Sequence, residues 1–223
     1  MSAQAAKKRT STPTKPTVAK STAPRTRSAP AYHHGDLPKT LKLAALEVLS
    51  GPEAHLLSFR DLARRLGVTT AAPYHHFKDR TTLLVALAID GYKLLYDDFL
   101  QAAQESEQYA DRIRSLTLAY LGFARRERGY YAAMFLPEVS AASSPELKSA
   151  ANLSFDLIRD LIAEHRPDLT REQASERTVS IWSFLHGMIV LSAAGPLSRR
   201  LPRKEQDRFA VESIERWLGS DPA

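Results

Sequence analysis

Residues 58–77 read SFRDLARRLGVTTAAPYHHF, and this stretch decides the fold. Ser58 followed by Asp61 three positions later has the spacing of a capping box, which predicts that a helix starts at Ser58. Leu62 and Ala63 lie on the inner face of that helix. Gly67 is expected to end it, because glycine accepts the positive φ that a sharp turn requires.

A second, very short helix is predicted between the two threonines and Phe77. Thr69 or Thr70 is expected to cap its start. Pro73 restrains the residue before it, so the first turn should be tight or partly 3₁₀. A helix, a short turn with glycine and a second helix form a helix–turn–helix, whose second helix enters the DNA major groove. An ordinary helical hairpin is the alternative on spacing alone.

The flanking sequence is also helical. A 3.6-residue period over Leu37–Leu49, with Asp36 as N-cap and Pro38 in the first turn, predicts a helix that ends at Gly51-Pro52. Asp79 is expected to cap a long helix that reaches Ala103. Further helices are predicted near residues 108–129, 131–136, 145–165, 170–194 and 203–218. No run alternates convincingly and no Asn-Gly or Asp-Gly hairpin signal is present, so the predicted fold class is all-α.

Composition excludes several classes of site. The chain has 223 residues with 43% apolar and 25% charged residues, which is ordinary for a globular protein. It has no cysteine, which excludes disulfide scaffolds, thiolate nucleophiles and cysteine-based metal centres. The most apolar stretch, residues 181–197, contains polar residues and reads as a buried helix rather than a membrane span. Because the first residues lack an apolar signal segment, we expect a cytoplasmic protein.

Charge is unevenly distributed along the chain. Residues 1–31 carry a net charge of +7, residues 32–80 of +2 and residues 81–223 of −3. Residues 1–31 are rich in Ser, Thr, Ala, Pro and Lys, which predicts a disordered basic tail. Such a tail could follow DNA phosphates, or it could only add solubility. Deleting it should reduce the slope of log K against log salt if it contacts DNA.

The block from Tyr32 to about Leu95 resembles the DNA-binding domain of TetR-type transcriptional regulators. Three features carry the resemblance: LARRLGV in the first helix of the motif, the YHHF ending of its second helix, and the Lys-Asp-Arg link into Leu83-Leu84. Farther along, the run from Trp182 through His186 to Gly187 resembles the Trp–His–Gly (WHG) signature of one subgroup of TetR C-terminal domains. The resemblance implies a basic tail (1–31), a helix–turn–helix domain (32–85) and a helical regulatory and dimerisation domain (86–223).

The resemblance also implies which residues contact DNA. Arg60 corresponds to a family position that reaches a base or a phosphate, and an arginine there could bind guanine in a bidentate manner; a solvated surface arginine is the alternative. Lys78 and Arg80 open the next helix, where cations can bind the phosphate backbone. The full predicted set is Arg60, Thr69, Thr70, Ala71, Tyr74, His75, His76, Lys78 and Arg80.

Metal binding and catalysis have little support in the sequence. The pairs His33-His34 and His75-His76 are adjacent residues, which point about 100° apart on a helix and do not naturally chelate one ion. Beyond about residue 104 there is no phosphate loop, nucleophile elbow or metal signature. We therefore predict no catalytic residue, no metal and no cofactor.

The C-terminal half is rich in aromatic residues at helical spacing. Core packing is the simplest explanation for most of them, yet such a core often leaves a cavity for an apolar or aromatic small molecule. His186, on a strongly apolar helix, is a hydrogen-bonded core residue, a ligand contact or a dimer contact. The predicted ligand-binding set is Tyr96, Phe99, Tyr120, Phe123, Tyr131, Phe135, Trp182 and His186.

By resemblance, the helices near 170–194 and 203–218 pair with their mates in a homodimer. Two recognition helices would then lie one DNA turn apart, so double-stranded DNA with a near-palindromic operator is the predicted partner. The predicted function is a repressor that a small-molecule effector releases from DNA. An activator, a ligand-independent regulator, a sequence-neutral DNA binder and a small helical enzyme are the alternatives.

Overall fold

The computed structural model describes residues 36–52 and 54–219. The basic tail over residues 1–31 and the pair His33-His34 lie outside the described residues. The described residues pack as one compact unit.

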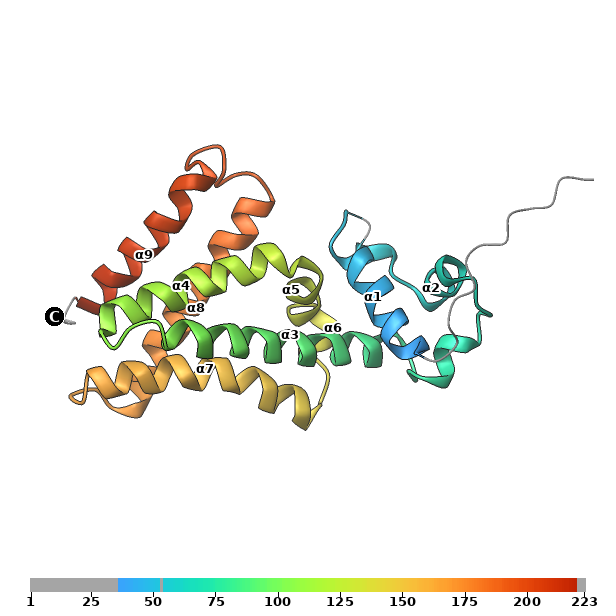
Figure 1. Ribbon diagram of the computed structural model, residues 1–223, viewed down its shortest axis with the longest axis horizontal. Helices are drawn as coiled ribbons and strands as arrows, with labels where there is room; N and C mark the ends of the chain where they lie inside the picture. The colour runs from blue at the N-terminus through green and yellow to red at the C-terminus, as the bar shows by residue number, and fades with distance from the viewer. Residues whose placement is uncertain (1–35, 53, 220–223) are drawn as a thin grey trace, which may run out of the picture. The chain divides into compact units, whose positions relative to one another are not determined.

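The described residues form helices and connecting turns, without a strand, which confirms the all-α fold class (Figure 1). The elements are α1 (Leu37–Leu49), η1 (Ala54–Leu56), α2 (Phe59–Leu66), η2 (Ala72–His75), α3 (Arg80–Ala103), α4 (Tyr109–Arg126), α5 (Arg128–Met134), α6 (Pro137–Ser140), α7 (Pro145–His165), α8 (Arg171–Ala193) and α9 (Arg203–Gly219).

Predicted helix caps are present at four positions. The carboxylates of Asp36 and Asp79 accept hydrogen bonds from the backbone N–H groups at the starts of α1 and α3, and the Ser58 hydroxyl does the same for α2. Gly67 ends α2 with φ of 66°, the left-handed conformation for which glycine is suited. These local signals confirm where the helices of the motif begin and end.

The expected threonine cap is wrong. The second element of the motif is a 3₁₀ helix that starts only at Ala72, and no side chain caps it. The backbone carbonyl of Thr69 accepts a hydrogen bond from the Ala72 N–H at 3.0 Å instead. Pro73 explains the tight turn, because its ring fixes φ and it sits in the first turn, where its missing N–H costs little.

The helices predicted near 108–129 and 131–136 are α4 and α5, but the break between them comes earlier than predicted, at Glu127 (φ −105°, ψ 48°). The earlier break places Gly129 in α5, against the end of α1. A Cβ on Gly129 would lie 2.5 Å from the Leu46 carbonyl oxygen. Pro137 then holds Leu136 in an extended conformation and starts α6, which the sequence analysis did not anticipate.

The long helix α3 is the axis of this unit. Figure 1 shows α4 on one side of it and α7 on the other, with α8 and α9 completing the helical body and α1 and α2 near its N-terminal end. Phe99, Phe123 and Ile162 are among the fully buried side chains of the core. No helix within residues 36–52 and 54–219 combines the length and apolarity that crossing a bilayer requires.

Candidate functional site

The helix–turn–helix is held together by a small apolar cluster. Phe59 and Leu62 of α2 are buried, and so is Pro73 of η2. The Tyr74 ring packs edge-on against Phe59, with ring centroids 5.0 Å apart and an interplanar angle of 74°. This contact fixes the direction of η2 relative to α2, which a DNA-reading element requires.

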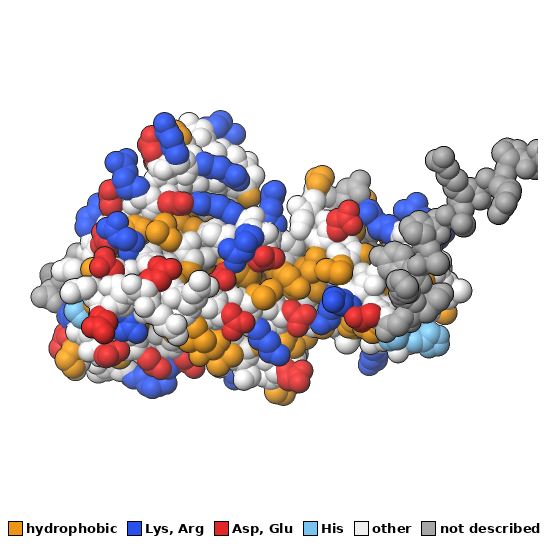
Figure 2. Space-filling view, viewed as in Figure 1, with side chains coloured by type: hydrophobic (Ala, Val, Ile, Leu, Met, Phe, Trp, Pro, Cys, Tyr) orange, Lys and Arg blue, Asp and Glu red, His pale blue; other side chains and the backbone are white. Residues whose placement is uncertain are grey.

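The outer face of this motif carries most of the predicted DNA contacts. Tyr74 keeps 60% of its surface exposed although its ring packs on Phe59. Figure 2 shows histidine side chains, in pale blue, exposed at the end of the unit that carries η2. The predicted residues that are exposed are Arg60, Thr69, Thr70, Ala71, Tyr74, His75, His76 and Lys78.

Arg80 is placed differently from the other predicted contacts. Its side chain is one-third exposed, and its Nε donates a hydrogen bond to the Leu57 carbonyl oxygen at 2.9 Å. Its Nη1 forms an ion pair with Glu138 of α6. The pKa of the Glu138 carboxyl is lowered, first by a hydrogen bond from the backbone N–H of Glu138 itself and second by the hydrogen bond from Arg80. Arg80 therefore joins the segment before α2 to the helical body.

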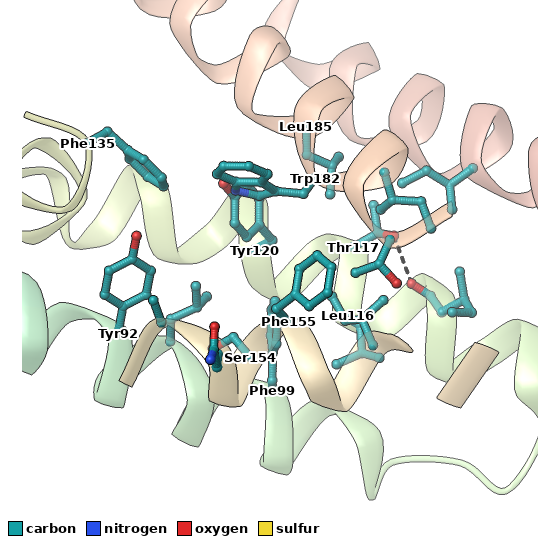
Figure 3. Close-up of a pocket in the computed structure, with 18 residues that line it drawn as sticks. Tyr92, Phe99, Leu116, Thr117, Tyr120, Phe135, Ser154, Phe155, Trp182 and Leu185 are labelled. Carbon is teal, nitrogen blue, oxygen red and sulfur yellow. Dashed lines mark hydrogen bonds between the residues drawn. The ribbon is translucent and has the colours of Figure 1, made fainter. Parts of the chain in front are cut away.

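An apolar cavity of about 220 Å³ lies inside the helical body (Figure 3). Its walls come from α3, α4, α7 and α8, and Phe135 after α5 and Ile214 of α9 complete the lining. Six of the eighteen lining residues are aromatic: Tyr92, Phe99, Tyr120, Phe135, Phe155 and Trp182. A cavity of this size and polarity can enclose a small organic molecule.

The predicted ligand-binding residues fall into two groups. Phe99, Tyr120, Phe135 and Trp182 line the cavity. Four others do not line it: Tyr131 and His186 form a layer behind it, Phe123 is fully buried in the core, and Tyr96 is half-buried on α3.

A chain of hydrogen bonds links the cavity wall to α5. The hydroxyls of Tyr120 and Tyr131 lie 3.3 Å apart, and the Tyr131 hydroxyl lies 2.7 Å from His186 Nδ1. Burial raises the pKa of both tyrosines and lowers the pKa of His186. All three groups are therefore held neutral, which suits a buried hydrogen-bonded network.

The sequence analysis missed the contribution of α7 to the cavity. Phe155 and Ser154 line the wall, together with Ala151 and Ile158. Ala151, Phe155 and Ile158 are spaced by four and three residues, so they share one face of a helix. That periodicity was visible in the sequence, but it looks the same whether the face packs against a core or borders a void.

The outward faces of α8 and α9 carry large apolar side chains. Those that remain 40% or more exposed are Val179, Trp182, Val190, Leu191, Phe209 and Trp217. Phe184 packs against Trp217 at 4.9 Å and so ties the two helices together. Val211 and Ile214 of α9 are buried inside the unit instead.

Among the described residues, no group of three or more His, Cys, Asp or Glu side chains could hold a metal ion.

Two family models match the chain. Residues 43–87 match "Bacterial regulatory proteins, tetR family", and residues 113–216 match "Tetracyclin repressor-like, C-terminal domain". The first match covers the helix–turn–helix, and the second covers most of the walls of the cavity.

Individual proteins are similar over most of the chain. A solved structure of a protein of unknown function from Rhodococcus sp. RHA1 is 31% identical, covering 86% of this chain and all of that one, with a TM-score of 0.69. A regulatory protein of the tetR family from Rhodococcus RHA1 shares the fold, with 18% identity over 81% of this chain and 94% of that one and a TM-score of 0.60. The transcriptional regulator BetI of Escherichia coli (strain SE11) is 24% identical over 176 residues, 77% of this chain and 90% of its own length.

Proposed function

The chain belongs to the TetR family of bacterial transcriptional regulators, and we propose that it is a homodimeric repressor that a small molecule releases from a palindromic operator. The observation that carries this proposal is that one helix joins the two candidate sites. Arg80 at the start of α3 donates a hydrogen bond to Leu57, directly before the helix–turn–helix, and Tyr92, Leu95 and Phe99 of the same helix line the cavity.

The proposal divides the chain into a basic tail (1–31), a DNA-binding domain (32–85) and a regulatory and dimerisation domain (86–223). Dimerisation through α8 and α9 is supported by the exposed apolar side chains on those helices. Burying such a face against its twofold mate removes apolar surface from water. The assignment of the Trp182–Gly187 run to the WHG subgroup remains a prediction, as does a cytoplasmic location without catalytic activity.

In the proposed dimer, two η2 segments lie about 34 Å apart and read successive major grooves. The candidates for base and phosphate contacts are the exposed members of the predicted set, and their exposure supports this role: Arg60, Thr69, Thr70, Ala71, Tyr74, His75, His76 and Lys78. Because Arg80 is engaged within the protein, we assign it to coupling rather than to DNA contact.

In the proposed switch, a ligand in the cavity displaces α3 and, through the Tyr120–Tyr131–His186 chain, α5. Both helices lead to the DNA-binding part: α3 through its N-terminal end, and α5 through the close contact between Gly129 and Leu46. The resulting change in the spacing of the two η2 segments weakens operator binding. An activator remains the alternative outcome of the same switch.

Selection of random duplexes on the purified protein at near-physiological salt tests the DNA-binding part of the proposal. We expect enrichment of an inverted repeat. Arg60→Ala should weaken binding to the selected site by about 5–150-fold if Arg60 reads a base. Lys78→Ala should weaken binding to every duplex and reduce the salt slope by about one if Lys78 contacts a phosphate.

Tyr74 offers a matched pair of variants. Tyr74→Phe keeps the ring on Phe59 and removes only the hydroxyl, whereas Tyr74→Ala removes both. Loss of operator binding in both variants, with the helical content unchanged, would support a hydroxyl contact with DNA. If the selection of random duplexes enriches no particular sequence and binding is only salt-sensitive, the protein is a sequence-neutral DNA binder instead.

A further inference from the structure

The cavity has no charged wall. None of the eighteen residues that line it is Asp, Glu, Lys, Arg or His. Transferring an unpaired charge from water into such a site costs several kcal/mol or more. The lining therefore favours a ligand without a formal charge.

Most hydroxyls around the cavity already have partners. Thr117 and Thr178 donate to carbonyl oxygens four residues earlier in their own helices, at 2.8 and 2.9 Å. The Tyr120 hydroxyl is paired with that of Tyr131. These groups need nothing from a ligand.

Ser154 is different. Its side chain is on the α7 wall of the cavity and only 6% of the residue is exposed (Figure 3). Of the described residues that line the cavity, it alone has a buried side-chain oxygen without a hydrogen-bond partner. Because this oxygen has almost no accessible surface, the hydroxyl must rotate about χ1 to meet a ligand in the cavity. A buried unpaired hydroxyl costs about 1–3 kcal/mol, a cost that a ligand with a matching group would remove.

The volume indicates the size of ligand that the cavity can hold. A closed cavity of about 150 Å³ lined by apolar residues holds benzene. This cavity, at about 220 Å³, is roughly one and a half times as large. It therefore suits about ten non-hydrogen atoms, such as a substituted or fused ring.

We propose that the effector is an uncharged, mainly apolar molecule of about this size whose single hydroxyl or carbonyl group hydrogen-bonds to Ser154 Oγ. The inference rests on the proposed function for the meaning of "effector", but the site itself is defined by the cavity alone. Because six aromatic rings line the cavity, a quaternary ammonium ion held by cation–π contacts is the alternative ligand. The absence of a carboxylate from the lining favours the neutral ligand.

Four matched probes separate these possibilities: 4-propylphenol, propylbenzene, 4-propylbenzoate and benzyltrimethylammonium. Their dissociation constants are measured by calorimetry on the full chain without DNA, for the wild type, Ser154→Ala and Ser149→Ala. Ser149 is the control, because it is an exposed serine on the same helix and does not line the cavity.

The wild type should bind 4-propylphenol at least as tightly as propylbenzene and should bind both charged probes at least tenfold more weakly. Ser154→Ala should raise the Kd of 4-propylphenol about tenfold relative to that of propylbenzene, because the phenol loses its partner. Propylbenzene binding should stay within about twofold, which also shows that the variant is folded. Ser149→Ala should leave all four constants unchanged.

Three results would overturn the inference: an unchanged phenol-to-hydrocarbon ratio in Ser154→Ala, tighter binding of either charged probe, or no binding of any probe. The proposed function fails separately. If the phenol binds through Ser154 but no operator is selected, the ligand site is supported and the proposed repressor function is contradicted. If an operator is selected but Ser154→Ala changes no dissociation constant, the repressor function is supported and the ligand inference is contradicted.

Discussion

Gly129 of α5 packs tightly against the end of α1, where the DNA-binding part meets the helical body. In Gly129→Ala, the new Cβ would lie 2.5 Å from the Leu46 carbonyl oxygen and 2.9 Å from Ser50 Oγ. A normal carbon–oxygen contact is about 3.3 Å, so α5 must retreat by about 0.8 Å. Backbone lines this contact and cannot rotate away, unlike the end of a flexible side chain.

Overpacking of this kind costs about 1–3 kcal/mol. The gain from replacing a helical glycine by alanine is at most about 1 kcal/mol and is smaller near a helix start, where Gly129 sits. Gly129→Ala should therefore lower the free energy of unfolding by about 1–2 kcal/mol. Gly122→Ala is the matched control, because Gly122 lies inside α4 and its Cβ would meet nothing within 4 Å.

Urea denaturation followed by circular dichroism, at one fixed protein concentration, gives both values. Gly122→Ala should be neutral or more stable than the wild type by up to about 1 kcal/mol. A Gly129→Ala variant as stable as Gly122→Ala would refute the close contact. The route through α5 to the DNA-binding part would fall with it.

Three other predictions concern charged and titratable groups. Arg80→Ala should reduce the factor by which an effector weakens operator binding. Glu138→Gln should reduce this factor less, because its amide oxygen still accepts a hydrogen bond from Arg80. The same factor in the wild type and both variants would contradict the role of this pair. Since burial lowers the pKa of His186, the unfolded chain binds more protons than the folded protein, and the free energy of unfolding should fall as pH drops below about 6.5. Denaturation at each pH should show that the free energy of unfolding of His186→Gln falls less between pH 7.5 and 5 than that of the wild type. His55→Gln, a control at an exposed histidine, should follow the wild type. Asp79→Ala removes the N-cap of α3 and should lower the free energy of unfolding by about 0.5–2 kcal/mol, whereas Asp79→Asn should recover most of the loss.

Local signals in the sequence predicted the helices around the motif well. Asp36, Ser58 and Asp79 act on backbone groups within four residues, and Gly67 acts through its own φ. Such effects depend on few neighbours and can be inferred without a tertiary structure. The family resemblance, based on residues close in sequence, also identified the fold.

Tertiary contacts decided where the sequence analysis went wrong or stopped. The break at Glu127 is followed by the packing of Gly129 on Leu46 of α1, 83 residues earlier in the chain, which local sequence does not reveal. The engagement of Arg80 depends on Glu138, 58 residues later. Whether an apolar helix face borders a void or a core depends on the helices opposite, so the sequence could not show that Phe155 lines the cavity and that Phe123 does not.

The most direct test of the central claim, that the cavity and the DNA-binding surface form one switch, is a reciprocal binding measurement. A neutral aromatic probe of the cavity, 4-propylphenol, is titrated into the protein with and without saturating amounts of the selected operator. Linkage predicts that operator DNA raises the Kd of the probe by the factor, typically about 5–150, by which the probe raises the Kd of the operator. An identical probe Kd with and without operator would show that the two sites are independent and would contradict the account.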